Sequence, residues 1–217
     1  MAERNRPPHT VPAKAKRPHG AHRFFVASPK AGRRLELWGI KQLNRWIELE
    51  ADPEIHALCE RPLVIQDGAR SRCVDCWVTG LKGSSYLLLG RPSTAKNSGT
   101  SPPEFPAFVK WASEQGCTVK EEIPHEVTEE RQRWYSNWTS VLQEIAGLRA
   151  QLPTGLVDDV RASVSGPTRV SDLFTKFPEQ SEALVRVAAY QLVYRGDLQF
   201  CDLGSALLSD ESQVTPR

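Results

Sequence analysis

The stretch SRCVDCWVTGLKGSSYLLLGR, residues 71–91, has the pattern of two β-strands joined by a turn. Residues 73–78 and 85–89 are rich in valine, leucine and aromatic side chains, whereas residues 80–84 carry the glycine and serine that are typical of a turn. Residues 85–89 are apolar on both faces, which is typical of a strand that is covered on both sides of a sheet. We therefore expect a β-hairpin whose second strand is central in a sheet.

The elements around this hairpin predict one α/β domain over residues 23–125. Its expected strands are residues 24–26, 35–38, 63–65, 73–78, 85–89 and 117–123, and its expected helices are residues 40–51 and 105–115. The first helix ends where Pro53 pushes Asp52 out of helical angles, and Gly116 is expected as the C-cap of the second. Residues 92–104 have the composition of a mobile loop.

A second domain, residues 126–217, is expected to be small, all-helical and winged-helix-like. Its expected helices are residues 129–152, 156–163, 171–177 and 181–194, followed by a short strand at 198–201. Two helices joined by a tight turn are typical of a helix-turn-helix. From Ala150 to the C-terminus, however, nine acidic residues outnumber six basic ones. Because this is the wrong sign for binding a duplex, we expect the domain to contact protein.

Positive charge is concentrated at the N-terminus. Residues 1–34 hold nine basic residues and one acid, although the whole chain has a formal net charge of only +2. Residues 1–22 are rich in proline and basic side chains and have few large apolar ones, so we expect a disordered arm. Such an arm is suited to salt-sensitive contacts with phosphates, or it is a solubilising tail with no specific partner.

The composition is that of an ordinary globular protein, with 40% hydrophobic and 25% charged residues in 217. The sequence has no run of about 18 apolar residues and no N-terminal apolar stretch of the signal-peptide kind. Five cysteines, an odd number, fit a reducing compartment better than a disulfide framework. We therefore expect a cytoplasmic protein.

Several short motifs occur in an order that resembles a known family. They are Ser28-x-Lys30-x-Gly32-Arg33, Asp52-Pro53, Glu60-Arg61-Pro62 and the hairpin around Asp75. This order resembles the restriction-endonuclease-like N-terminal domain of the TnsA subunit of heteromeric transposases, and the likeness spans about residues 24 to 210. The resemblance implies a subunit that nicks the 5′ ends of a mobile element while a partner DDE transposase handles the 3′ ends.

The four catalytic positions implied by the resemblance fall on Gln42, Asp75, Leu89 and Arg91, of which only Asp75 keeps the residue type of the family. Nucleases of this kind hold Mg²⁺ with several carboxylates. Gln42 offers an uncharged carbonyl, Leu89 offers no ligand, and Arg91 stays protonated. With Asp75 as the single negative ligand, the site is expected to bind Mg²⁺ weakly or not at all. Arg91 is then expected to pair with Asp75 or to hold a DNA phosphate.

The function expected from these positions is architectural rather than catalytic. DNA contacts are assigned to four basic residues, Lys30, Arg33, Arg34 and Arg91. The resemblance implies double-stranded transposon ends and the DDE transposase as partners, and a regulatory AAA+ ATPase that binds the C-terminal domain. We therefore expect a nuclease-deficient subunit that bridges DNA, transposase and ATPase.

Two alternatives remain open. One is an active metal-dependent endonuclease with a rearranged site. The other is a zinc-containing DNA-binding regulator, because His56-x-x-Cys59 and Cys73-x-x-Cys76 resemble a zinc-ribbon spacing. Residues three apart in a strand face opposite sides, so we expect buried structural cysteines here rather than zinc ligands.

Overall fold

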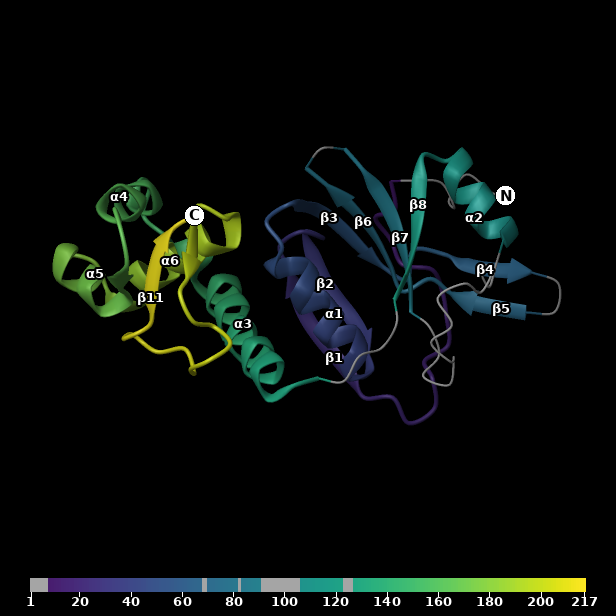
Figure 1. Ribbon diagram of the computed structural model, residues 1–217, viewed down its shortest axis with the longest axis horizontal. Helices are drawn as coiled ribbons and strands as arrows, with labels where there is room; N and C mark the ends of the chain where they lie inside the picture. Colours follow the sequence, from purple (N-terminus) through teal and green to yellow (C-terminus); the bar gives the residue numbers. More distant parts are fainter. Residues whose placement is uncertain (1–7, 68–69, 82, 91–105, 123–126) are drawn as a thin grey trace. The chain divides into compact units, whose positions relative to one another are not determined.

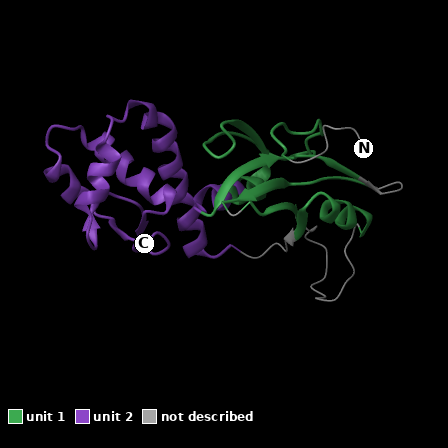
Figure 2. Ribbon diagram, turned by 90° about the horizontal axis from the view of Figure 1, so that it is seen from above, with its two compact units in different colours: residues 1–45, 54–126 green, residues 46–53, 127–217 purple. Residues whose placement is uncertain are grey.

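A computed structural model describes residues 8–67, 70–81, 83–90, 106–122 and 127–217 (Figure 1). The chain divides into two compact units, residues 1–45 with 54–126 and residues 46–53 with 127–217 (Figure 2). Residues 46–53, which the sequence predicts to belong to the first domain, group here with residues 127–217. Residues 1–7 of the predicted arm, Arg91 and the predicted loop 92–104 lie outside the described residues. None of the described helices has the length and apolar character needed to cross a bilayer.

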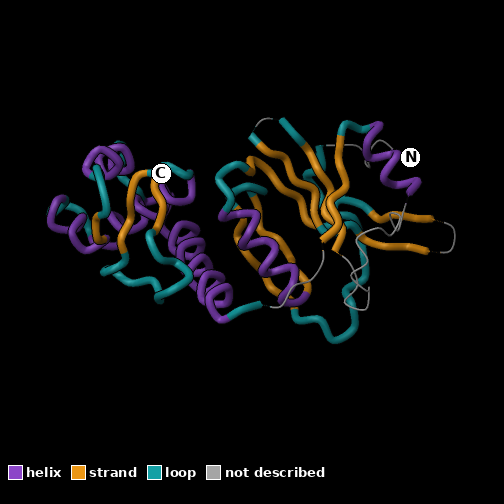
Figure 3. The backbone as a smooth tube through the Cα atoms, viewed as in Figure 1, coloured by secondary structure: helices purple, strands orange, loops and turns teal. Residues whose placement is uncertain are grey.

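The centre of unit 1 is a four-stranded mixed sheet. Its strands, in spatial order, are β3 (Ile55–Glu60), β6 (Cys76–Gly80), β7 (Ser85–Gly90) and β8 (Cys117–Glu122). The first three are antiparallel, and β8 runs parallel to β7. A parallel pair needs a crossover connection, and the connection from β7 to β8 carries α2 (Pro106–Glu114), which lies beside β8 (Figure 3).

Strand β7 is central and buried on both faces, as its apolar sequence predicts. Leu87 and Leu89 belong to the core cluster that includes Phe108 and Ala112 of α2, while Leu88 is buried on the opposite face. This alternation follows from the two-residue period of a strand. The mixed α/β character expected for this part of the chain is therefore confirmed.

Two short antiparallel ribbons complete unit 1. They are β1 (Arg23–Ser28) with β2 (Arg33–Trp38), and β4 (Val64–Asp67) with β5 (Arg70–Cys73). The prediction of one strand over residues 73–78 is wrong, because the chain changes partners between β5 and β6. The Val74 N–H donates to the Leu63 carbonyl, and the Asp75 N–H donates to the Leu88 carbonyl.

Unit 2 combines helices with a small sheet. It contains the second half of α1 (Gly39–Ala51), then α3 (Glu129–Leu148), a 3₁₀ turn (Arg149–Gln151), α4 (Leu156–Ser163), α5 (Val170–Lys176) and α6 (Glu182–Arg195). Strands β9 (Thr168–Arg169), β10 (Leu198–Phe200) and β11 (Gln213–Pro216) form a sheet in the order β10-β11-β9. The prediction of an all-helical second domain is therefore wrong. The sheet depends on β11, which pairs with strands distant in sequence.

Helix α6 is the central element of unit 2. It packs against α3, α4, α5 and β10, and nine of its fourteen residues are buried. A helix that is apolar on all sides is suited to such a position. The helix ends at Gly196, whose φ of 83° favours glycine. An added Cβ there would lie 2.7 Å from the Cβ of Pro53, so the close approach also requires glycine.

Residues 8–13 make defined contacts with unit 1, contrary to the disorder predicted for residues 1–22. His9 is buried, with its ring edge-on to Trp77 at a centroid distance of 5.8 Å. The Ala13 N–H donates to the Arg61 carbonyl at 2.7 Å, and the Thr10 carbonyl accepts from Arg33 Nε at 3.1 Å. These contacts offset the entropy of ordering that composition alone leaves uncompensated.

Candidate functional site

The β6–β7 hairpin brings Asp75 next to the end of β7. The register pairs Cys76 with Leu88, and the Asp75 N–H continues this pairing by donating to the Leu88 carbonyl at 3.0 Å. Asp75 is half-buried. Burial raises the pKa of the Cys73 thiol to about 11, and the negative charge of Asp75 acts in the same direction. Asp75, the one acid that matches the family pattern, thus lies beside a half-buried thiol.

The two positions that the family pattern fills with glutamate make structural contacts. Leu89 is almost fully buried in the core that α2 covers. Gln42 lies in the first turns of α1, where its Oε1 accepts the Trp38 N–H at 2.8 Å. This bond satisfies an N–H at the start of the helix. Neither residue replaces a carboxylate, and Arg91 lies outside the described part of the chain.

A buried ion cluster lies in unit 1 around Glu60, a residue of the Glu60-Arg61-Pro62 motif. Arg33 donates to both carboxylate oxygens of Glu60, at 2.9 and 2.5 Å. Such a bidentate ion pair is the strongest arrangement of an arginine and a carboxylate. The hydrogen bond to Glu60 raises the pKa of Arg33. Arg61 Nη2 lies 3.7 Å from Glu60 Oε1, so two guanidinium groups surround one carboxylate.

Arg61, a member of this cluster, has an unusual backbone conformation. Its φ of 46° is the one positive value at a non-glycine residue in the described ranges. The residue is only 5% exposed, its guanidinium carbon lies 4.1 Å from the centre of the Trp38 ring, and Nη1 donates to the Glu36 carbonyl. The backbone N–H donates to the Asp75 carbonyl at 3.0 Å. Strained residues of this kind persist only where the surrounding contacts fix them.

The basic residues expected to contact DNA differ in their surroundings. Arg33 directs its guanidinium to Glu60 and is partly buried, so its charge is used inside unit 1. Arg34 is exposed, with its guanidinium carbon 5.9 Å from the centre of the Phe25 ring. Lys30 lies in the turn between β1 and β2 and is half-buried. Of these three, Arg34 presents its charge most openly to solvent.

The cysteines and His56 do not form a metal centre within the described ranges. No three His, Cys, Asp or Glu side chains there lie close enough together to share an ion. Cys59 is buried, and its sulfur accepts a hydrogen bond from Arg33 at 3.6 Å. Burial raises the pKa of Cys59 to about 11 and raises that of Cys76 as well. These thiols are protonated core residues at neutral pH.

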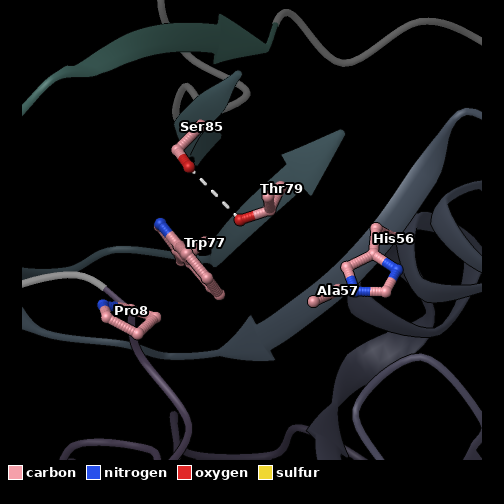
Figure 4. Close-up of a pocket in the computed structure, with 6 residues that line it drawn as sticks. All are labelled: Pro8, His56, Ala57, Trp77, Thr79 and Ser85. Atoms are coloured by element: carbon pink, nitrogen blue, oxygen red, sulfur yellow. Dashed lines mark hydrogen bonds between the residues drawn. The ribbon is translucent and has the colours of Figure 1, made fainter. Parts of the chain in front are cut away.

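An open pocket of about 400 Å³ lies on unit 1 near the β6–β7 turn. It is lined by Pro8, His56, Ala57, Trp77, Thr79 and Ser85. In Figure 4 the Trp77 ring lies between Pro8 and Thr79, and the Thr79 and Ser85 hydroxyls are 3.2 Å apart. The lining is mainly apolar, and Asp75 is not part of it. The pocket is therefore separate from Gln42, Asp75 and Leu89, the three described positions that the family pattern singles out.

Thiol modification tests the burial of the cysteines. With Ellman's reagent at pH 8 we expect one fast-reacting thiol per chain, Cys201, because the other four cysteines are wholly or partly buried. A thiol with a pKa of about 11, such as Cys59 or Cys73, is roughly 0.1% ionised at pH 8. Cys201→Ser should abolish the fast phase, and two or more fast thiols in the wild type would contradict the structure.

The raised pKa values of Cys59 and Cys73 also determine the direction in which the stability of the folded protein changes with pH. The folded protein favours the protonated form of Cys59 and Cys73, since burial raises both pKa values. This contribution to stability is complete below the pKa of an unfolded thiol, about 8.5. It is lost as the pH rises through 11, where both thiols should become reactive.

No protein-family model matches the chain, and no curated protein matches it either. Sequence reasoning missed two features of the candidate site: the role of Arg61 as a buried cation and the exposure of Phe25. No local signal indicates the first, because Arg61 is buried by contacts with Trp38 and Glu36, which belong to β2. The exposure of Phe25 could have been predicted from the alternation along Arg33–Trp38, which indicates the buried face of this strand and of the strand paired with it.

Proposed function

We propose that the protein is a TnsA-like, DNA-binding subunit of a heteromeric transposase that has lost its nuclease activity. Unit 1 is then a restriction-endonuclease-like domain, with its hairpin and crossover helix on a mixed sheet. The proposal rests mainly on the arrangement of residues at the C-terminal end of β7. Asp75 pairs by backbone with this end, and Leu89, which takes the place of a carboxylate, is buried in the core.

The ion cluster around Glu60 supports the loss of metal-dependent chemistry. In a metal site, carboxylates are neutralised by the bound cation. Here Arg33 and Arg61 supply positive charge to Glu60 from within the chain. Gln42, in turn, uses its only oxygen ligand on the Trp38 N–H. Within the described residues, these contacts leave few anionic oxygens for an ion near Asp75.

The proposed DNA partner is supported by the charge of the N-terminal region. No acidic residue occurs between Arg4 and Leu35, and this stretch contains exposed cations such as Lys14, Lys16 and Arg17. Phosphates bind to such a region through charge, independently of base sequence. We assign double-stranded DNA to unit 1 for this reason.

Unit 2 is proposed to be a winged-helix domain that binds protein, in keeping with an AAA+ ATPase partner. Support comes from the order of elements: helices α4 to α6 precede the antiparallel pair β10–β11, and β9 completes the sheet. In this proposal α6 would be the recognition helix, yet it is buried among its neighbours and unsuited to a DNA groove. Residues 127–217 also hold twelve acidic and nine basic residues, which disfavours DNA.

The connection between β10 and β11 further disfavours DNA binding by unit 2. Asn137 of α3 is buried, donates to the Leu203 and Ala206 carbonyls at 2.7 Å, and accepts the Leu208 N–H at 2.9 Å. Arg133 donates to the Gly204 and Ser205 carbonyls at 3.0 and 2.9 Å. A connection held to a helix by five hydrogen bonds is not free to follow a DNA groove.

A nicking assay tests the loss of activity. We expect no Mg²⁺- or Mn²⁺-dependent nicking of supercoiled plasmid or of labelled duplex, because a single carboxylate holds these ions weakly. The matched control is Asp75→Ala, assayed at the same concentrations. Cleavage by the wild type that disappears in Asp75→Ala would overturn the proposal and favour the active-endonuclease alternative. Cleavage that persists unchanged in this variant would come from a contaminating nuclease.

A further inference from the structure

The β1–β2 ribbon has one buried face and one exposed face. Leu35 and Leu37 of β2 are buried, whereas Arg34 is exposed and Glu36, between the two leucines, is half-buried. In β1, Arg23 and Phe25 are exposed on the same side. Phe25 is 57% exposed, and it is the only aromatic residue among the large apolar side chains exposed in the described ranges. A large ring left in water at the centre of a strand is unusual for a residue type that normally packs inside.

Two arginines flank the Phe25 ring. The guanidinium carbons of Arg23 and Arg34 lie 5.7 and 5.9 Å from the ring centre. Arg23 also pairs with Glu36 at 2.8 Å, whereas Arg34 makes no ion pair with any residue that the structure describes. Glu36 is the single acid on β1 and β2. We call Arg23, Phe25 and Arg34 the ribbon triad.

The chemistry of the triad identifies the partner it fits. The positive charge of the arginines matches phosphate, and the chain enters β1 from the exposed, basic segment of Lys14, Lys16 and Arg17. Phosphate, however, gains nothing from a phenyl ring. A nucleotide base with a phosphate on either side fits a ring between two guanidinium groups, because the base can stack on the ring while the phosphates bind the arginines. Inside a duplex the base faces are covered by their neighbours, so the ring needs an unpaired base.

We propose that the ribbon triad binds unpaired nucleotides at a DNA end, with Phe25 stacked on a base and Arg23 and Arg34 on the adjacent phosphates. This inference rests on the proposed DNA binding and adds to it a surface and a preferred substrate form. A blunt duplex binds through phosphate contacts alone. A duplex with a single-stranded overhang binds through the same contacts and through stacking.

Fluorescence anisotropy with two sets of oligonucleotides tests the proposal. One is a blunt 20-base-pair duplex, and the other is the same duplex with a five-nucleotide 5′ or 3′ overhang. We expect the wild type to bind one of the overhang duplexes roughly tenfold more tightly, because stacking of one base on an aromatic ring is worth about 1–3 kcal/mol. Phe25→Ala should bind both forms equally, and Phe25→Tyr should keep the preference.

The role of Arg34 is tested by measuring how the affinity for DNA depends on salt concentration. Arg34→Gln should weaken binding to both forms and lower the slope of log affinity against log salt by about 1, since one phosphate contact is lost. Leu207→Ala changes an exposed apolar residue of unit 2, 68% exposed, and should leave both affinities unchanged. A 2-aminopurine in the overhang should be quenched by the wild type and not by Phe25→Ala.

The outcomes separate this inference from the proposed function. If the wild type binds neither form at 50 mM salt, both the DNA-binding function and the ribbon inference are wrong. If it binds DNA but shows no overhang preference, or if Phe25→Ala retains that preference, the ribbon inference alone is overturned. An unchanged salt slope in Arg34→Gln would also overturn it.

Discussion

Replacing Glu50 with alanine is expected to lower the free energy of unfolding by about 3–5 kcal/mol. Glu50 is fully buried in unit 2, at 0% exposure. Its carboxylate accepts the Tyr194 hydroxyl at 2.6 Å and the Trp46 indole N–H at 3.3 Å. The alanine would leave two buried donors without this acceptor and open a cavity between them. Each unsatisfied buried donor costs about 1–3 kcal/mol.

The Glu50 contacts also join segments that are far apart in the chain. Residues 46–53 group with unit 2, and the bond from Glu50 to Tyr194 spans 144 residues. Burial raises the pKa of Tyr194, and the charge of Glu50 raises it further, so the tyrosine remains a neutral donor at physiological pH. Loss of Glu50 should therefore destabilise the attachment of residues 46–53 to unit 2.

Urea unfolding followed by far-UV circular dichroism measures the effect, with three comparison variants. Glu50→Gln keeps an acceptor oxygen and most of the volume, so it should cost about 1–2 kcal/mol. Tyr194→Phe removes one donor together with its hydrogen bond and should cost about 1.5–3 kcal/mol. Glu182→Ala changes an exposed acid and should cost under about 1 kcal/mol. An effect of Glu50→Ala no larger than that of Glu182→Ala would show that the buried contacts are absent.

Elements with strong local signals could be predicted from the sequence. The helix 156–163 has the bounds expected for it, and α1 ends at Ala51, as Asp52-Pro53 predicts. The strands β3 and β11 could not be predicted, because pairing decides them. β3 pairs with β6 through an irregular register near Ile55 and Ala57, and β11 pairs with two strands distant in sequence. Local periodicity contains no information on such partners.

In the candidate site, too, contacts between residues far apart in the sequence could not be predicted, here for side chains. The spacing from Asp75 to Leu89 predicts that a hairpin brings these positions together, and the register of β6 and β7 agrees. The sequence also assigns Arg33 to DNA, yet this arginine pairs with Glu60, 27 residues away. This side-chain pairing joins β2 to β3, and no local pattern specifies it. The sequence thus predicted the backbone of the site better than the partners of its charges.

Arg61 offers a test in which charge and backbone strain can be separated. Arg61→Ala should lower the free energy of unfolding by about 3 kcal/mol, because removing one member of a buried ion cluster costs about 3–5 kcal/mol and Arg33 still pairs with Glu60. Arg61→Gly removes the same side chain. At a φ of 46°, glycine avoids the steric cost of about 1–2 kcal/mol that alanine has in left-handed angles.

We therefore expect Arg61→Gly to be more stable than Arg61→Ala by about 1 kcal/mol, the reverse of the usual order for these two residues. Arg61→Lys keeps the charge but not the planar group that lies over Trp38, so it should fall between the wild type and Arg61→Gly. Chemical denaturation of the four proteins under one condition gives the ranking. Equal stability of Arg61→Gly and Arg61→Ala would argue against the left-handed backbone. If all three variants lay within about 0.5 kcal/mol of the wild type, the buried cluster would contribute little to folding.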